Sequence, residues 1–135
     1  MHYTRSLLLT CLIIFVSTAA WSVDTKIKYT GTFTSLEYNK EGGDLLGEEI
    51  KIVVTRKGYQ GALQISEGGP SQLMLVDVFF DKNQIRFEIP SSYPTYGGGV
   101  FEGKIDDKGI RGVLKFKGGA DNSVKWVRGR SYWDK

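Results

Sequence analysis

Cysteine and histidine are almost missing from this chain, which has one of each among its 135 residues. Both, Cys11 and His2, lie in a leader that we expect to be removed. The remaining domain then has no disulfide, so a hydrophobic core must stabilise it. It also has no thiol or imidazole, which excludes nucleophilic sites built on Cys or His and the usual zinc, copper or haem ligands. We therefore expect no cofactor and no metal, and the metal alternative that stays open is a hard, oxygen-ligated cation.

The leader is short of apolar residues for a membrane span, which needs about 20. Arg5 precedes an apolar run over residues 7–16, and small residues lead to Ser22. This order is typical of a secretory signal peptide cleaved near Ser22, and it predicts a periplasmic or secreted protein. The alternative is a lipid attached at Cys11. The sequence thus divides into a signal peptide, 1–22, and a single domain, 23–135.

The chain also lacks a large excess of positive or negative charge. The net charge of +3 falls to +2 once Arg5 leaves with the leader. A balance so near zero gives no reason to expect a nucleic acid or an anionic membrane surface as partner.

Helical spacing of apolar residues is absent as well, whereas alternating segments broken by Gly, Asn and Asp recur throughout residues 26–133. We count eight such segments, and no connection between them is long enough for a crossover helix. The pattern predicts an all-β, eight-stranded, antiparallel up-and-down β-barrel, in which the first and last strands pair. A two-sheet β-sandwich is the alternative.

The clearest hairpin lies in residues 101–116, around an Asp106-Asp107-Lys108-Gly109 turn. Its register sets Gly103 opposite Gly112 and Phe101 opposite Leu114 on one face. The same apolar-x-Gly-x-apolar unit recurs around Gly31 and Gly61. Glycines on an inward face let a sheet bend and close.

The residues that alternate inward are bulky. Either they fill the barrel, with aromatic rings over the glycines, or they leave a small apolar pocket at the glycine level. The inward set includes Val54, and the aromatic residues that we expect to line the barrel are Tyr29, Phe33, Tyr59, Phe87, Phe101 and Trp126.

In residues 72–80, the odd and the even positions are both largely apolar, so alternation does not show which of them face inward. The turn at residues 81–84 decides this instead. Pairing Phe80 with Ile85 turns Leu73, Leu75 and Phe79 outward. An outward apolar stripe of this kind suits a partner protein or a weak dimer.

Acidic residues gather in the segment Glu37–Glu49, which could bind Ca²⁺, hold a carboxylate pair for hydrolysis, or form a solvated loop. The alternation of inward and outward positions places Glu37 as the only acidic or basic side chain facing inward. This argues against a general acid or base inside the barrel. The enzymatic alternative is a carboxylate-based hydrolase or cyclase at the barrel mouth, using Glu37, Asp44, Glu48 or Glu49.

Two aromatic segments are the candidate binding sites. One is the loop at residues 90–99, with Tyr93, Tyr96 and three consecutive glycines. The other is the tail, in which Arg128 precedes Tyr132 and Trp133. Either could be structural: a plain connection in the first case, and a cap on the barrel end in the second.

In length, strand count and leader the chain resembles the calycin architecture of lipocalins and avidins. Gly31-x-Phe33 stands where lipocalins have Gly-x-Trp, and Arg128 is the candidate for the Arg that packs over that aromatic ring. The segments 43–48, 64–68 and 130–133 are similar to those of small exported bacterial proteins of unassigned function. The resemblance implies a fold and no activity.

These observations predict an exported, non-enzymatic binding module. Its partner is either a protein or a small apolar ligand, and the chain is a monomer or a weak dimer. The sequence leaves the choice of partner open.

Overall fold

The computed structural model describes residues 26–93 and 95–134. The leader predicted over residues 1–22 lies outside these residues. The described chain is almost entirely strand, and its elements are β1 (Gly31–Thr34), β2 (Glu37–Asn39), β3 (Asp44–Thr55), β4 (Gly58–Gly68), β5 (Met74–Asp81), β6 (Gln84–Ile89), β7 (Gly99–Ile105), β8 (Gly109–Phe116), β9 (Asn122–Gly129) and the short 3-10 helix η1 (Tyr132–Asp134).

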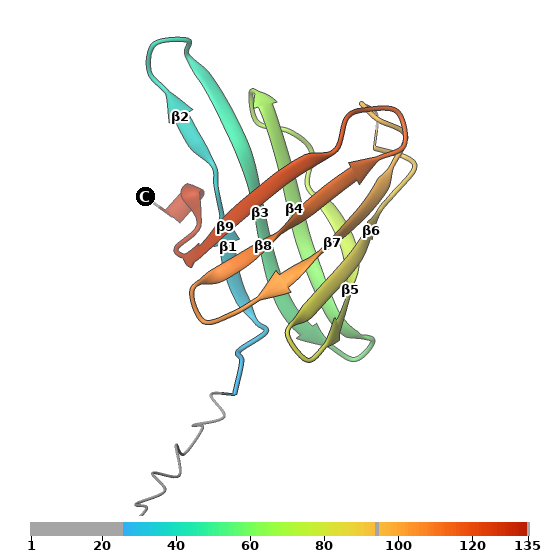
Figure 1. Ribbon diagram of the computed structural model, residues 1–135. Coiled ribbons are helices and arrows are strands. Elements are labelled where there is room, and N and C mark those ends of the chain that lie inside the picture. The colour runs from blue at the N-terminus through green and yellow to red at the C-terminus, as the bar shows by residue number, and fades with distance from the viewer. Residues whose placement is uncertain (1–25, 94, 135) are drawn as a thin grey trace, which may run out of the picture.

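Every consecutive pair from β2 to β9 is antiparallel, and β1 closes the ring because it pairs with both β3 and β9. The predicted up-and-down barrel is confirmed, and the sandwich alternative is wrong. β1 and β2 keep one register with β3, in which Thr34 faces Glu49 and Glu37 faces Leu46. They are therefore two pieces of one first strand, which makes the barrel eight-stranded (Figure 1).

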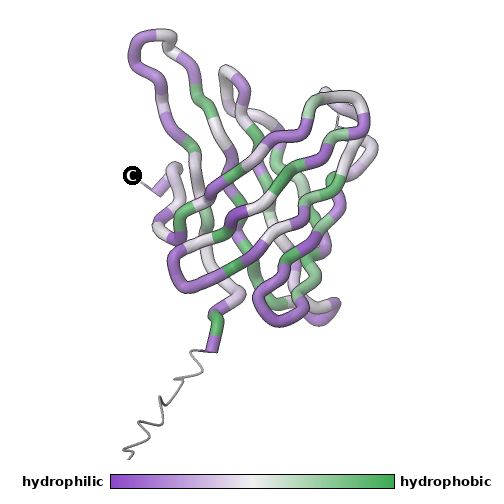
Figure 2. The backbone as a smooth tube through the Cα atoms, in the orientation of Figure 1, coloured by the Kyte–Doolittle hydropathy of each residue, from purple (hydrophilic) through white to green (hydrophobic). Residues whose placement is uncertain are grey.

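The hairpin register predicted from the sequence is confirmed at each pair. Phe101 lies opposite Leu114, Gly103 opposite Gly112, and Phe80 opposite Ile85. Hydrophilic residues occupy the turns at the lower end of the barrel in Figure 2, while the strands alternate between hydrophilic and hydrophobic positions. This alternation gives each strand one buried and one solvated face.

The barrel is filled where its glycines leave room. The ring of Phe101 lies over Gly103 and Gly112, since a Cβ at either position would come within 2.7 Å of Phe101 Cζ. Ile50 and Val76 occupy the equivalent space at Gly61. Of the six predicted lining aromatics, Tyr29 and Tyr59 are half-buried at one end, and the four with no exposed surface are Phe33, Phe87, Phe101 and Trp126.

The first residues described close the lower end of the barrel. The ring of Tyr29 stacks on Phe80 at 4.2 Å and meets Tyr59 edge-on at 5.7 Å. Its hydroxyl donates a hydrogen bond to the backbone oxygen of Lys82, in the β5–β6 turn. Val54 has the parity of Ile50 and Ile52 and pairs with Tyr59, but it is not buried as predicted: it is 63% exposed, because β3 runs past the core into its turn.

Candidate binding surfaces

The acidic segment lies on a long hairpin. Most of this segment is strand rather than a solvated loop, because β3 begins at Asp44, and the hairpin rises above the barrel (Figure 1). Glu37 is exposed, so its predicted inward orientation is wrong. Glu48 faces inward instead, because it lies two residues before Ile50 and so shares the inward face of Ile50 and Ile52. We missed Glu48, because the predicted alternation turned only Glu37 inward.

Glu48 is a buried carboxylate held by hydrogen-bond donors. Ser35 Oγ and Trp126 Nε1 donate to its Oε2, at 2.8 and 3.1 Å, and Asn122 Nδ2 donates to its Oε1 at 2.9 Å. The carboxylate thereby satisfies the indole N–H of a Trp that has no exposed surface. It links β3 to β9 at the level where β1 breaks off.

Glu49 points the other way and anchors the tail. Its two carboxylate oxygens accept hydrogen bonds from Ser131 Oγ, at 2.5 Å, and from the backbone N–H of Tyr132, at 2.8 Å. Trp133 Nε1 donates to Gln64 Oε1 at 2.8 Å, so η1 lies on the outer wall of β3 and β4. The segment's carboxylates therefore lie on different faces, and Glu48 and Glu49 cannot act as a pair.

Arg128 lies at the lower end of the barrel, at the seam between β1 and β9. Its guanidinium lies over the ring of Phe33, 4.5 Å from the centroid. It also donates hydrogen bonds to the backbone oxygens of Thr30, at 2.9 Å, and Lys28. The predicted packing of Arg128 over the ring of Phe33 is therefore confirmed.

The tyrosine loop folds onto the upper end of the barrel. Tyr93 is buried in the core, and Tyr96 packs on Phe116 with ring centroids 4.5 Å apart. Burial raises the pKa of the Tyr93 hydroxyl, and the hydrogen bond from Tyr96 to Glu67 raises the pKa of the Tyr96 hydroxyl. Both phenols therefore stay protonated at neutral pH, and the Tyr96 hydroxyl donates to Glu67 at 2.8 Å.

The five candidate residues from the two aromatic segments lie in three places. Tyr93 and Tyr96 are at the mouth, Arg128 is at the lower end, and Tyr132 and Trp133 are on the outer wall. The first three are engaged in the fold, whereas Trp133 is 52% exposed. The structure thus leaves Trp133 as the most accessible aromatic residue of the set.

The outward stripe from β5 lies beside Trp133. Leu73, Leu75 and Phe79 are 63%, 76% and 62% exposed, which matches the predicted orientation. Leu73, Trp133 and Ala62 line a recess on this wall, and Ala62 is the strand partner of Leu75. We call these four exposed side chains the apolar wall: Leu73, Leu75, Phe79 and Trp133.

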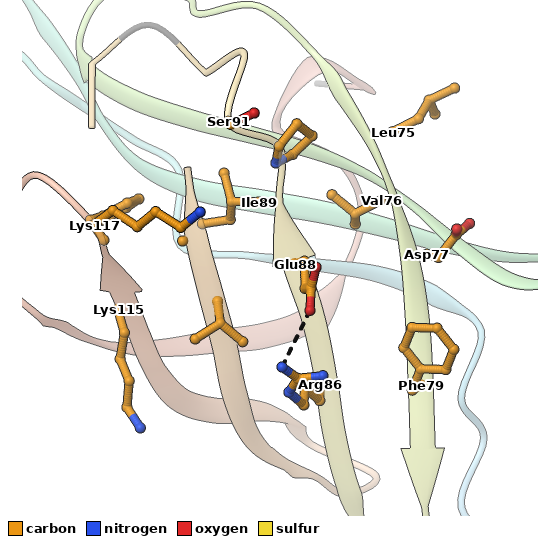
Figure 3. A pocket seen from close by; sticks show the side chains of 14 residues that line it. Leu75, Val76, Asp77, Phe79, Arg86, Glu88, Ile89, Ser91, Lys115 and Lys117 are labelled. Carbon is orange, nitrogen blue, oxygen red and sulfur yellow. Dashed lines mark hydrogen bonds and ion pairs between the residues drawn. The ribbon is translucent and has the colours of Figure 1, made fainter. Parts of the chain in front are cut away.

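A groove lies next to the apolar wall, between β5 and β6. It has a volume of about 850 Å³ and is lined by Leu75, Val76 and Phe79 from one strand and by Glu88 and Ile89 from the other. Figure 3 shows Val76 on the groove side of β5, Leu75 on the opposite side of that strand, and Ile89 on the side of β6 that is away from β5. The apolar wall thus continues into a groove.

Ion pairs cross the outer face of β6, β7 and β8. Glu102 pairs with Lys115 at 2.7 Å and lies 3.7 Å from Arg86, which also contacts Glu88 at 3.4 Å. The hydrogen bond and the charge of Lys115 lower the pKa of Glu102, and Glu102 in turn raises the pKa of Lys115. This polar face borders the groove on the side away from the apolar wall.

Comparisons with family models, with curated proteins and with solved structures find no match to this chain. The class is therefore set by the fold: a closed eight-stranded antiparallel barrel, compatible with a calycin-like architecture. Among residues 26–93 and 95–134, no helix is long and apolar enough to cross a membrane. Within the same residues, no three acidic, His or Cys side chains are grouped to hold a metal ion.

Proposed function

We propose that this chain is an exported protein-binding module whose partner docks on the apolar wall. The observation that carries the proposal is the exposure of four large apolar side chains, between 52% and 76%, along one side of the barrel. Exposed apolar side chains gathered on one face are a common mark of a protein-binding site, and Asp77 lies between Leu75 and Phe79 on this face. The arrangement of residues 1–22 supports export.

The filled interior favours a protein over a small apolar ligand as partner. The ring of Phe101 occupies the space at Gly103 and Gly112, and the neighbouring rings of Phe87 and Trp126 stack around it at 4.9 Å. A ligand inside the barrel would have to displace these rings, and burying each one stabilises the fold by about 1.5–3 kcal/mol. Recognition on the outside avoids that loss.

The wall also has the composition of an interface. Trp is among the residues most enriched at interaction hot spots, and Trp133 is held in place by its hydrogen bond to Gln64. A side chain that is already ordered loses less conformational entropy when a partner binds.

The test is native mass spectrometry of the full-length chain, expressed in and purified from the envelope of the cell that makes it. We expect a complex with a second protein for the wild type, and its loss in Leu75→Asp and in Phe79→Asp. The matched control is Val127→Asp, because Val127 is 56% exposed on β9, on the opposite side of the barrel. Retention in both wall variants, or a small molecule as the only bound mass, contradicts the proposal.

A further inference from the structure

The groove beside the apolar wall is a place where the barrel wall is open. Pairing between β5 and β6 runs from Asp81 with Gln84 to Val78 with Phe87. The same register would place Asp77 opposite Glu88 and Val76 opposite Ile89, and all four belong to strands. Among the described residues, no such pairing continues the ladder. The two strands therefore separate in the upper part of this wall, where the groove lies.

Each strand is held by its other neighbour. The pairing of β5 with β4 extends through Leu75 with Ala62 and Met74 with Leu63. The pairing of β6 with β7 extends through Glu88 and Ile89. Both edges thus stay extended although they do not pair with each other. Pro90 follows at once and has no N–H, so β6 cannot lengthen the ladder there.

The open edge of β5 has backbone groups to offer. In an antiparallel sheet, every second residue turns its N–H and C=O towards a given neighbour. Of residues 74–77, two therefore turn these groups towards the groove. Unpaired strand edges of this kind are templates for an added strand.

The side chains around the edge suit an extended chain. Val76 and Ile89, each 3% exposed, form an apolar floor, and Leu75 and Phe79 form an apolar rim on the outer side. Successive side chains of a strand point to opposite faces. An added strand with alternating apolar residues would place one set on the floor, while a side chain of the other set could contact the rim.

We infer that the groove binds an extended segment of the partner protein as an additional strand on β5. The inference rests on the proposed function and specifies the form in which the partner is recognised. A segment bound in this way gains main-chain hydrogen bonds from the strand edge and specificity from alternate side chains. A helix or a compact small molecule would leave the edge groups of residues 74–77 without partners.

Two charged side chains lie on opposite sides of the groove. Asp77 lies on the β5 rim, where it accepts a hydrogen bond from Gln60 Nε2 of β4, and Lys117 lines the far side beyond the end of β8. Neither forms an ion pair within the described part of the chain. The bound segment is therefore expected to carry a basic residue close to Asp77.

The experiment uses the full exported chain, purified after secretion, and a phage library of linear peptides as the probe. We expect enriched peptides with apolar residues at alternating positions. A synthetic enriched peptide should slow amide hydrogen exchange in residues 74–77 at least about tenfold. Enrichment of no peptide, or protection confined to the tyrosine loop, overturns the inference.

Two N-methylated versions of that peptide provide a matched control. Each carries methyl groups on alternate amides, in opposite parities, so composition and side chains are identical. Methylation of the parity that faces β5 should weaken binding at least about tenfold, because it removes several main-chain hydrogen bonds. Equal binding of the two versions overturns the inference.

The two proposals can fail separately. If Leu75→Asp abolishes capture of the natural partner but the methylated peptides bind alike, partner docking stands and strand addition falls. If protection of residues 74–77 grows with protein concentration without peptide, a second copy of the chain occupies the edge, and the inference is wrong. If Leu75→Asp leaves capture of the partner unchanged, the proposed function fails.

Discussion

At the scale of residues, small positions decide how closely the chain can pack. Gly103 and Gly112 face each other across β7 and β8, and the ring of Phe101 lies over both. Neither has a positive φ, so they are needed for space rather than for backbone freedom. Glu48 shows the opposite case, a polar side chain that is buried because three donors satisfy it.

Gly112→Ala tests the close packing. A Cβ there would lie 2.4 Å from the backbone oxygen of Glu102 and 2.6 Å from Phe101 Cζ. We expect a loss of about 1–3 kcal/mol in the free energy of unfolding, as for other overpacked cores, measured by urea unfolding. Gly129→Ala is the control, because its Cβ would meet nothing within 4 Å. Equal stability of the two variants would contradict the packing argument.

Asp106 gives a prediction about pH. Hydrogen bonds from the backbone N–H of Lys108, at 2.8 Å, and of Gly109 lower its pKa in the folded state. A lowered folded pKa means that the ionised carboxylate stabilises the fold above the unfolded pKa of about 3.9. This contribution is lost as the pH falls through the lowered folded value.

Asp106→Ala should therefore destabilise the protein at pH 7 by about 1 kcal/mol, the worth of a typical hydrogen bond. The difference between variant and wild type should shrink towards pH 2, measured by urea unfolding across that range. Asp107→Ala, in the same turn, is the matched control. A difference that grows on acidification would show that the sign is wrong.

At the scale of elements, short pieces of chain are attached to the barrel from outside. η1 is held on β3 and β4 by Glu49 and Gln64, and the tyrosine loop is held by Tyr93 and by the hydrogen bond from Tyr96 to Glu67. β5 and β6 do not pair over residues 74–77 and 88–89, although the strands are paired next to their turn. The ends and edges of strands thus carry the features available for binding.

Glu49→Ala tests the attachment of the tail. It removes the acceptors of Ser131 Oγ and of the Tyr132 N–H, so the tail should detach while the barrel stays folded. We expect faster trypsin cleavage after Arg130, by about tenfold, and a red shift in the emission of Trp133. Glu41→Ala, in the exposed hairpin loop, should change neither. Unchanged cleavage in Glu49→Ala would show that other contacts hold the tail.

At the scale of the whole molecule, the barrel closes where the first strand pairs with a neighbour on each side. β1 lies between β3 and β9, and β2 continues with β3 alone. Arg128 holds this seam at the lower end through Phe33, Thr30 and Lys28. The carboxylate of Glu48 holds it higher up, by accepting from Trp126 and Asn122.

Arg128→Lys tests the seam. Lys keeps the charge but has no planar group to cover the Phe33 ring and reach two backbone oxygens together. We expect a loss of about 2 kcal/mol in unfolding free energy, from hydrogen bonds to a charged group, and faster hydrogen exchange over residues 26–34. Arg56→Lys, at an exposed position, is the control. Full stability in Arg128→Lys would show that strand pairing alone closes the barrel.

The sequence by itself determined the strands, their hairpin registers and the closed barrel, because alternation and turn chemistry are local signals. Tertiary structure decided the rest. Glu48 faces inward because distant Ser35, Asn122 and Trp126 offer it donors, and the loop tyrosines are used in packing at the mouth. The tail joins the apolar wall because Glu49 and Gln64 lie on an outer face that only the closed barrel defines. Contacts of this kind join residues far apart in the chain, and no local pattern encodes them.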